Sequence, residues 1–538
     1  MFGLGFKHSH LVNLMRLKQP LDKCAMGIVL FKEEMEGGSV IERYADERIT
    51  RIWSLLNKFN LWQDTEIAYL YAWEEIGAIP SGTPQEMELQ LRSKPINEAL
   101  IDEFDHVMKH DLNACLEEFR ARLDEKYHQW LHLRMTSYDT EEPPFAIMIR
   151  ESVKITLEKL DGLIEIFKKK ASEYRHVPMM GRTHGMEGEP QSQGKRFLNW
   201  LRELLIVRRS LAKSAKLLEY SKGAGAMGNH ADMDPRVEES ALKKLGFKVC
   251  YGVGQIMPRE IHAEIADALK RLAKTLAKIA TDVRLGARSG ADSIYQEPFG
   301  KGQLGSSAMP HKKNTITSEQ ETGLGRLATA YSLAIDENID TWEERAIEQS
   351  VVERIAWPDL FHVVLRAILN MKKVISGLVV KTKNMLRGII GTRGCYATNG
   401  ATQFIRVHGK EHGITSKDAY RIVQLAAFNA FYEPDAETVF ASIDEAVLAL
   451  ERLQDEAVKK VSIKDILSKA QLMAIPTHSA TVAEVDGYNA VLAKIFVVGS
   501  PVLVEWDRIF DIRTHLENEK RSYQEMLGMA QEGAMPEE

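Results

Sequence analysis

The segment 302–314, GQLGSSAMPHKKN, is a candidate catalytic loop. It carries two adjacent serines, Ser306 and Ser307, behind a glycine, and Lys312 follows shortly after them. A flexible segment of this kind can close over a ligand and complete a site only when substrate is bound. Its backbone N–H groups and the Lys312 ammonium would stabilise a developing oxyanion and help a serine hydroxyl to lose its proton. The alternatives are a mobile polar loop without chemistry, or a nucleophilic serine, although no G-x-S-x-G elbow surrounds these serines.

Three of the 16 histidines stand in segments where an imidazole could act as an acid or a base. His110 precedes Asp111 in MKHDLN, and His184 lies in the glycine-rich segment GRTHGMEGEP. His132 lies four residues before Thr136 in HLRMTSYD. A histidine can change its charge near neutral pH, which suits it to proton transfer. A structural or solvated role is the alternative for each of them.

Composition excludes several classes of function. The net charge of −6 gives no polybasic surface for nucleic acid. The four cysteines are scattered without a CxxC pair, which argues against a disulfide framework or a zinc site and fits a reducing compartment. No apolar run approaches the ~20 residues that span a bilayer, and the first residues lack the apolar segment of a signal peptide. We therefore expect a cytoplasmic protein without a metal, a membrane contact or a nucleic-acid partner.

The elements that must position these residues are predicted to be long helices. Apolar residues recur at helical spacing at positions 153, 157, 160, 164 and 167, and again from 261 to 283. Alternating strand patterns are scarce, so the fold class is mainly α. Stripes of this length need partner helices on several sides, and neighbouring subunits are a natural source of them. A bundle within one chain is the alternative.

Four segments interrupt the helical patterns: 136–145, 177–190, 222–235 and 388–400. The first of them, TSYDTEEPPF, is predicted to end an N-terminal helical region because it contains a double proline. We predict three helical domains: 1–135, 136–385 with the loop 302–314, and 386–538. The first ~35 and last ~70 residues are assigned no role.

Gly223, Gly225 and Gly228 spell GxGxxG, the dinucleotide-binding motif. The motif has that meaning only when it follows a strand and opens a helix. The residues before it have a helical pattern, and an Asp-Pro follows soon after. We therefore interpret the segment as a turn between helices, and we expect no nucleotide cofactor to bind there.

The chain resembles the fumarase/aspartase superfamily, lyases that release fumarate by β-elimination, and within it the adenylosuccinate lyase family. GSSAMPHKKN is similar to the superfamily's signature loop. Further similar stretches follow the family's order between about residue 41 and about residue 425: IERYADERITRIWSLLNKFNLWQDTEIAYLYAWEEIGAIP, HDLNACLEEF, HLRMTSYD, GRTHGMEGEP and WEERAIEQSVVERIAWPD. The resemblance implies a mostly α homotetramer with a central bundle of long helices, completed by tetramerisation, in which three subunits build each active site.

The resemblance also implies roles for individual residues. Ser306 falls at the general base, His184 at the general acid, and His110 at a histidine that supports this acid. His132, Lys312 and Glu319 fall around the substrate carboxylates and the acid–base groups. The positions that match a nucleotide phosphate site are Arg43, Tyr44, Arg345, Ser350 and Arg354. The positions that match further substrate contacts are Asp111, Thr136, Ser137, Gln255, Ser307, Met309 and Asn314.

The chain departs from the family pattern near the expected phosphate site. The family's Arg-Asp-x-x-His-Ser-Ser reads Arg345-Ala-Ile-Glu-Gln-Ser-Val here. Arg134 replaces a glycine, Tyr138 replaces a serine, and Thr315 replaces a proline. These changes spare the expected acid and base but alter the residues that would bind substrate.

The expected reaction is release of fumarate from adenylosuccinate to give AMP, and from succinylated aminoimidazole carboxamide ribotide. Its substrate carries two carboxylates and a phosphate, which arginine and lysine bind well. It needs a base at Cβ and an acid at the leaving nitrogen, without a cofactor. Two alternatives stay open: a related lyase that acts on another succinyl-amine adduct, and a binding or structural homologue that has lost catalysis.

Overall fold

The computed structural model describes residues 42–290, 293–309, 311–431, 461–475 and 480–532, with single positions between 442 and 449. These residues form two compact units. The first holds the described residues up to Lys154, with Ser214–Ala266 and Tyr331–Val363. The second holds Ile155–Lys213, Asp267–Ala330 and the described residues from Val364 onward. The first 41 residues lie outside the described ones, and the three-domain division stays a prediction.

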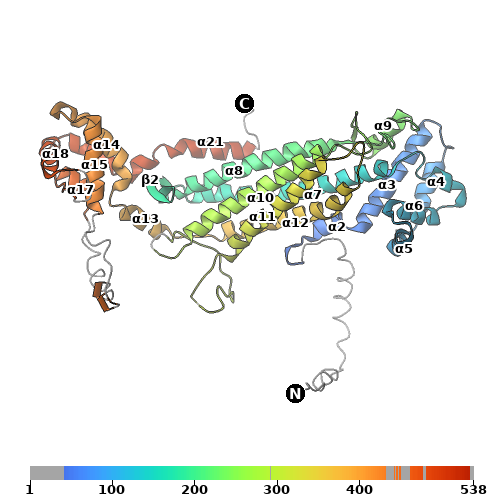
Figure 1. Ribbon diagram of the computed structural model, residues 1–538, viewed down its shortest axis with the longest axis horizontal. Helices are drawn as coiled ribbons and strands as arrows, with labels where there is room; N and C mark the ends of the chain where they lie inside the picture. Colours follow the sequence, from blue (N-terminus) through green and yellow to red (C-terminus); the bar gives the residue numbers. More distant parts are fainter. Residues whose placement is uncertain are drawn as a thin grey trace, which may run out of the picture. The chain divides into compact units, whose positions relative to one another are not determined.

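Long helices dominate the described chain, which confirms the mainly α prediction (Figure 1). Five of them have segments in both units: α7 (Ser137–Glu173), α8 (Gln193–Ser214), α10 (Glu260–Gly286), α11 (Ile316–Asp336) and α12 (Glu348–Ser376).

The first unit adds helix α3 and several shorter elements around one apolar core. Its further elements are η1 (Glu42–Tyr44), α2 (Glu47–Ile52), α3 (Leu55–Glu75), α4 (Thr83–Arg92), α5 (Glu98–Met108), α6 (Asp111–Arg122), η2 (Glu125–Trp130), η3 (Ala215–Glu219), β3 (Tyr220–Ser221), α9 (Pro235–Lys244), β4 (Lys248–Val249) and η4 (Glu337–Ile339). Trp62, Phe119 and Val237 are among the buried residues of this core, which joins α3, α6 and α9. The packing fixes α3 and α6, and α6 begins with the candidate site residue Asp111.

The second unit contains the strand hairpin and the C-terminal helices. Its further elements are β1 (Pro178–Thr183), β2 (Met186–Ser192), β5 (Tyr295–Gln296), β6 (Val379–Val380), α13 (Thr382–Gly391), η5 (Cys395–Ala397), α14 (Thr398–His408), η6 (Lys410–His412), α15 (Ser416–Ala430), α17 (Ile463–Ser468), α18 (Val482–Ile495), α19 (Val502–Ile509), α20 (Ile512–Leu516) and α21 (Glu519–Glu532). Phe404, Leu467 and Trp506 lie in the core of its C-terminal helices.

The double proline lies inside helix α7, so the prediction that it ends a helical region is wrong. α7 begins at Ser137 and continues through Pro143 and Pro144. Each proline removes one backbone donor and normally disfavours the helix. Packing opposes this cost: both prolines are buried, and the next residue, Phe145, packs edge to face on Trp357 of α12.

The segment GRTHGMEGEP forms the end of the first strand, the turn and most of the second strand of a hairpin, where the sequence indicated only an interruption. β1 and β2 are antiparallel, with Pro178 opposite Ser192 and Thr183 opposite Met186. His184 and Gly185 form the turn and have φ angles of 55° and 80°. Positive φ at both central residues matches the right-handed twist of the two strands, and this favours a tight hairpin. The fold therefore presents His184 at a hairpin tip.

The GxGxxG segment is a turn, as predicted, although a short strand precedes it. β3 ends at Ser221 and pairs in parallel with β4. The next helix, α9, begins only at Pro235, so the glycines do not open a helix. Within the described residues, no helix combines the length and the apolar composition needed to cross a membrane.

Candidate active site

The residues that the sequence singles out fall into two sets, one in each unit. In the first unit, Asp111 is the centre of an ionic cluster. Its Oδ2 accepts hydrogen bonds from Lys58 Nζ of α3 at 3.2 Å and from an Arg354 NH2 of α12 at 2.7 Å. Burial alone would raise the pKa of Asp111, but the two cations outweigh it and lower this pKa below its usual value. Asp111 is therefore a carboxylate that joins three helices.

His110 caps the N-terminus of α6. Its Nδ1 accepts a hydrogen bond from the backbone N–H of Asn113 at 3.3 Å. In the neutral tautomer that this bond selects, Nε2 carries the proton and faces the Ser137 hydroxyl at 3.5 Å. The cap therefore fixes both the ring and its tautomer.

A cavity of about 300 Å³ brings much of the expected phosphate site together. It is lined by Asp105, Lys109, His110, Asp111, Tyr138, Glu141, Arg345, Ile347, Ser350 and Arg354. Arginine forks and a serine hydroxyl are suitable donors for a phosphate. Arg43 and Tyr44 of η1 are not among the lining residues, so their predicted role stays untested.

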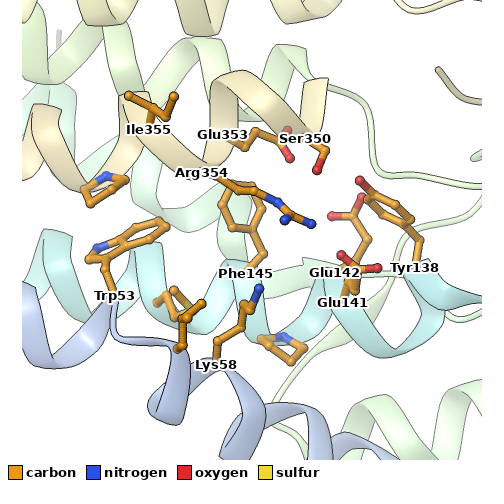
Figure 2. Close-up of a pocket in the computed structure, with 14 residues that line it drawn as sticks. Trp53, Lys58, Tyr138, Glu141, Glu142, Phe145, Ser350, Glu353, Arg354 and Ile355 are labelled. Atoms are coloured by element: carbon orange, nitrogen blue, oxygen red, sulfur yellow. The ribbon is translucent and has the colours of Figure 1, made fainter. Parts of the chain in front are cut away.

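A second cavity of about 330 Å³ shares Tyr138, Glu141, Ser350 and Arg354 with the first. Figure 2 shows that its charged side chains come from α3, α7 and α12. Its apolar lining consists of Trp53, Leu55, Pro144, Phe145, Met148, Ile355 and Pro358. The two cavities together place a group of charged side chains beside an apolar lining.

Arg345 is held by two neighbours of the first unit. Arg345 donates a hydrogen bond from NH1 to Gln255 Oε1 at 2.9 Å, and its guanidinium lies 4.2 Å from the centroid of the Tyr138 ring. Gln255 in turn donates to the backbone oxygen of Ala226 at 2.9 Å. A stacked guanidinium is oriented while its other N–H groups stay available to a ligand.

His132 is paired with Glu66, a residue that no motif in the sequence had indicated. The His132 Nδ1–H donates to Glu66 Oε1 at 2.8 Å, and its backbone N–H donates to Oε2 at 3.0 Å. Burial would lower the pKa of His132, but the nearby Glu66 carboxylate raises it above its usual value. Glu66 therefore favours the charged form of this imidazole.

Thr136 and Ser137 begin α7 over a buried ion pair. The Thr136 backbone N–H donates to Asp139 Oδ2 at 2.9 Å, and Lys222 Nζ donates to Asp139 Oδ1 at 2.6 Å. Lys222 also donates to the backbone oxygen of Gln255 at 2.9 Å. Both charged side chains are fully buried. The pair therefore ties the start of α7 to the glycine turn and to the Gln255 segment.

The second unit carries His184 and the signature loop. His184 is exposed at the hairpin tip. At the other end of the hairpin, Ser192 is bound by helix α21. Its backbone N–H donates to Glu519 Oε1 at 2.9 Å, and its hydroxyl lies 2.6 Å from the Tyr523 hydroxyl. The C-terminal residues, which had no predicted role, thus anchor the element that carries His184.

The loop directs two of its own N–H groups at Ser306. Ser306 Oγ accepts hydrogen bonds from the backbone N–H of Met309 at 3.1 Å and of Ala308 at 3.4 Å. Donors to a hydroxyl oxygen favour its deprotonated form, so this geometry helps the serine to act as a base. The expectation was that loop N–H groups would face a substrate oxyanion, but these two bind Ser306 itself.

The rest of the loop is folded back by Asn314. Its Nδ2 donates to the backbone oxygen of Gly305 at 2.8 Å. A side chain at Gly305 would collide with the backbone oxygen of Lys312, so the turn requires glycine there. Ser307, Met309, Lys312 and Glu319 are exposed, the last of them in the first turn of α11.

Comparison with known proteins identifies the family. Residues 49–328 match the family model described as "Lyase". Adenylosuccinate lyase from Aquifex aeolicus is 36% identical over 393 residues, which are 73% of this chain and 88% of the relative. The enzyme of that name from Thermotoga maritima is 33% identical over 430 residues, which are 80% of this chain and 95% of the relative. This chain belongs to the adenylosuccinate lyase family.

Solved structures agree on the fold of this family member. Fumarate lyase from Mesorhizobium sp. BNC1 is 17% identical, with a TM-score of 0.71 over 90% of this chain and 98% of the other. A 3-carboxy-cis,cis-muconate lactonizing enzyme from Pseudomonas putida is 16% identical, with a TM-score of 0.70 over 91% of this chain and 98% of the other. At these identities the likeness shows the fold alone, and it confirms the predicted fumarase/aspartase-like architecture.

Three of the positions at which this family member departs from the adenylosuccinate lyase pattern have a clear effect on the local structure. Arg134, in place of glycine, has a φ of 57°, a region that costs an L-residue roughly 1–2 kcal/mol. Gln349, in place of histidine, is buried, and its Nε2 donates to Thr341 Oγ1 at 2.9 Å. Tyr138, in place of serine, supplies the ring beneath Arg345.

Most of the residues that line the two cavities had not been predicted, and the charged or polar ones among them include Lys58, Tyr138 and Glu141. Tyr138 stood out only as a departure from the family. Lys58 lies in the stretch that resembles the family's opening and Glu141 in the segment 136–145, but neither position was assigned a role from the sequence. Among the described residues, no group of three or more histidine, cysteine or acidic side chains could hold a metal. The expectation that no metal takes part stays a prediction.

Proposed function

We propose that this protein is an adenylosuccinate lyase, which releases fumarate from adenylosuccinate to give AMP and also cleaves succinylated aminoimidazole carboxamide ribotide. The observation that carries the proposal is the cavity that joins Arg345, Ser350 and Arg354 to His110 and Asp111, in a chain that belongs to this family. A cytoplasmic location and the lack of a cofactor are parts of the same proposal.

The phosphate of the substrate would bind between Arg345 and Arg354, with the Ser350 hydroxyl as a further donor. Binding would have to compete with Asp111 for Arg354, since these two side chains form an ion pair here. A dianionic phosphate that accepts several N–H donors is a stronger partner for arginine than a single carboxylate. Lys58 of the same ionic cluster would add a positive charge.

Elimination needs one group to remove a proton and another to supply one. Ser306 would take the proton from Cβ of the succinyl group, helped by the two N–H groups that stabilise its alkoxide. His184 would protonate the departing nitrogen, and His110 would support it. His132 and Lys312 would bind the substrate carboxylates and stabilise the negative charge that develops on them. Glu319 would lie beside the acid–base groups.

The test of this function is the reaction itself. Purified protein incubated with adenylosuccinate is expected to release fumarate and AMP in equal amounts, measured by absorbance and by chromatography. Turnover of other N-succinyl amines without turnover of the nucleotide would favour the related lyase instead. That lyase is the second candidate because the Glu141 carboxyl lies in the same cavity as Arg345 and Arg354, where the phosphate would bind. Absence of any fumarate would favour a homologue without catalysis.

We expect a homotetramer with sites shared between subunits. Exposed apolar residues on the long helices support this, among them Ile206, Leu285, Leu327 and Leu333. Light scattering should therefore give four times the chain mass of 60.8 kDa. A fully active monomer would exclude shared sites.

Mixing two inactive variants tests which chains share a site. If His110 and Ser306 of one site come from different subunits, random mixing of His110→Ala and Ser306→Ala chains leaves about one quarter of the sites intact. Activity should therefore appear after co-refolding or subunit exchange. The control is each variant subjected alone to the same treatment, which should stay inactive. No recovery in demonstrated mixed oligomers would contradict the arrangement.

A further inference from the structure

Glu141 is an acidic residue in a cavity that also contains the cationic side chains of Lys109, Arg345 and Arg354. It lies on α7, lines both cavities, and shares them with Ser350 and Arg354 of α12 (Figure 2). Within the described part of the chain, its carboxyl makes no hydrogen bond or ion pair. The proposed function gives it no role, and an ionised carboxylate there would repel a phosphate.

The cations around Glu141 are already engaged by other groups. Lys58 and Arg354 both bind Asp111. Arg345 donates to Gln255 and lies over the Tyr138 ring. A negative charge on Glu141 therefore lacks a direct partner and faces the carboxylate of Asp111 as well.

These surroundings favour the neutral form of the Glu141 carboxyl. Burial raises its pKa, the charge of Asp111 raises it further, and the cations of the cluster lower it by less, so that the pKa is about 7. Near neutral pH, a small change in charge nearby decides whether this group holds its proton.

We propose that Glu141 links anion binding at Arg345, Ser350 and Arg354 to the uptake of one proton. The oxyanion enters when the Glu141 carboxyl is neutral, and the carboxyl then donates its O–H to an anion oxygen in place of repelling it. The proposal rests on the proposed function, which assigns these residues to the substrate phosphate, and it adds a pH-dependent specificity residue to that site.

Several other charged groups face the same space and need controls. They are Lys58 of α3, Asp105 and Lys109 at the end of α5, His110 and Asp111 at the start of α6, Tyr138 and Glu142 of α7, Arg345 before α12, and Glu353 and Arg354 of α12. Glu353 is paired with the buried Arg259, and burial raises the pKa of Glu353 to about 7 as well. His110 lines the cavity that also holds Arg345 and Arg354. Glu353 and His110 are thus the rival sources of a pH effect.

Sulfate binding to the full-length protein tests the proposal without turnover. Sulfate keeps the same charge through this pH range, unlike a phosphate ester, so only the protein titrates. If sulfate binds only the protonated form, its affinity should fall about ten-fold between about pH 6 and about pH 8 in calorimetry. In Glu141→Gln, which stays neutral, the affinity should be nearly constant. Arg354→Ala should abolish the binding and thereby locate it.

The matched controls are Glu353→Gln and His110→Asn, which should both keep the pH dependence of the unaltered protein. The proposal is overturned if Glu141→Gln keeps that pH dependence. It is also overturned if the unaltered protein binds no sulfate, or if Arg354→Ala binds sulfate as tightly as the unaltered protein. The fumarate assay is independent of both outcomes. A protein that releases fumarate but shows no effect of Glu141 contradicts only this inference, while proton-linked sulfate binding without fumarate release contradicts only the proposed function.

Discussion

Replacing Ser306 with alanine is expected to lower kcat by about 10²–10⁴-fold, the usual cost of removing a positioned general base. The structure adds a reason: Ser306 Oγ accepts the N–H groups of Met309 and Ala308, which stabilise its alkoxide. Alanine removes the proton acceptor but none of the proposed phosphate and carboxylate contacts. KM should therefore change much less than kcat in steady-state kinetics with adenylosuccinate.

Ser307→Ala is the matched control, because the change is chemically identical and lies one residue away. Ser307 is exposed, and its proposed role is only a substrate contact. Its kcat should stay within a small factor of the unaltered enzyme. If Ser306→Ala keeps near-normal kcat, the Cβ proton goes to another group and the assignment of the base is wrong. The predicted closure of the loop over the substrate can be followed by its protease sensitivity with and without fumarate.

Replacing His184 with alanine should be about as severe, with a loss of roughly 10²–10⁴-fold in kcat, but for a different step. The departing nitrogen leaves poorly unless it is protonated, so the defect should shrink when the substrate carries a better leaving group. The pH profile of kcat should also lose the limb that belongs to the acid. Comparing kcat for substrates of graded leaving-group pKa measures this.

Met186→Ala is the control for His184. Met186 is exposed at the same hairpin turn, opposite Thr183, and its side chain has no role in the proposed chemistry. It should keep kcat if only the imidazole matters. Equal losses of kcat in His184→Ala and Met186→Ala would mean that the reaction depends on the shape of the hairpin and that His184 does not supply the proton.

The sequence by itself determined the family, the helical class and the segments that carry the proposed acid and base. These features depend on neighbours in the chain. The turn at His184 and the fold of the loop around Ser306 use residues a few positions apart, and the close approach at Gly305 allows no side chain there. The periodicity of the long helices is local in the same sense.

Local rules also failed where packing opposed them. The double proline predicts a helix end, yet α7 continues through it because both prolines are buried and Phe145 packs on Trp357. The hairpin beneath His184 was missed because its strands have no regular alternation of buried and exposed residues. The contacts that hold the prolines come from α12, far away in sequence, whereas the hairpin pairs residues that are close together in the chain.

Only the tertiary structure decided the balance of charges in the cavity that contains Asp111, Glu141 and Arg354. Lys58, Asp111 and Arg354 lie on three helices, and no spacing rule relates them. The same holds for Glu141, which on sequence is one of many acidic residues. Whether a carboxyl is solvated, paired or left near neutrality depends on burial and on charges brought together by packing. The sequence therefore identified the groups that would react, while the packing of the helices set the charge that a substrate phosphate would encounter.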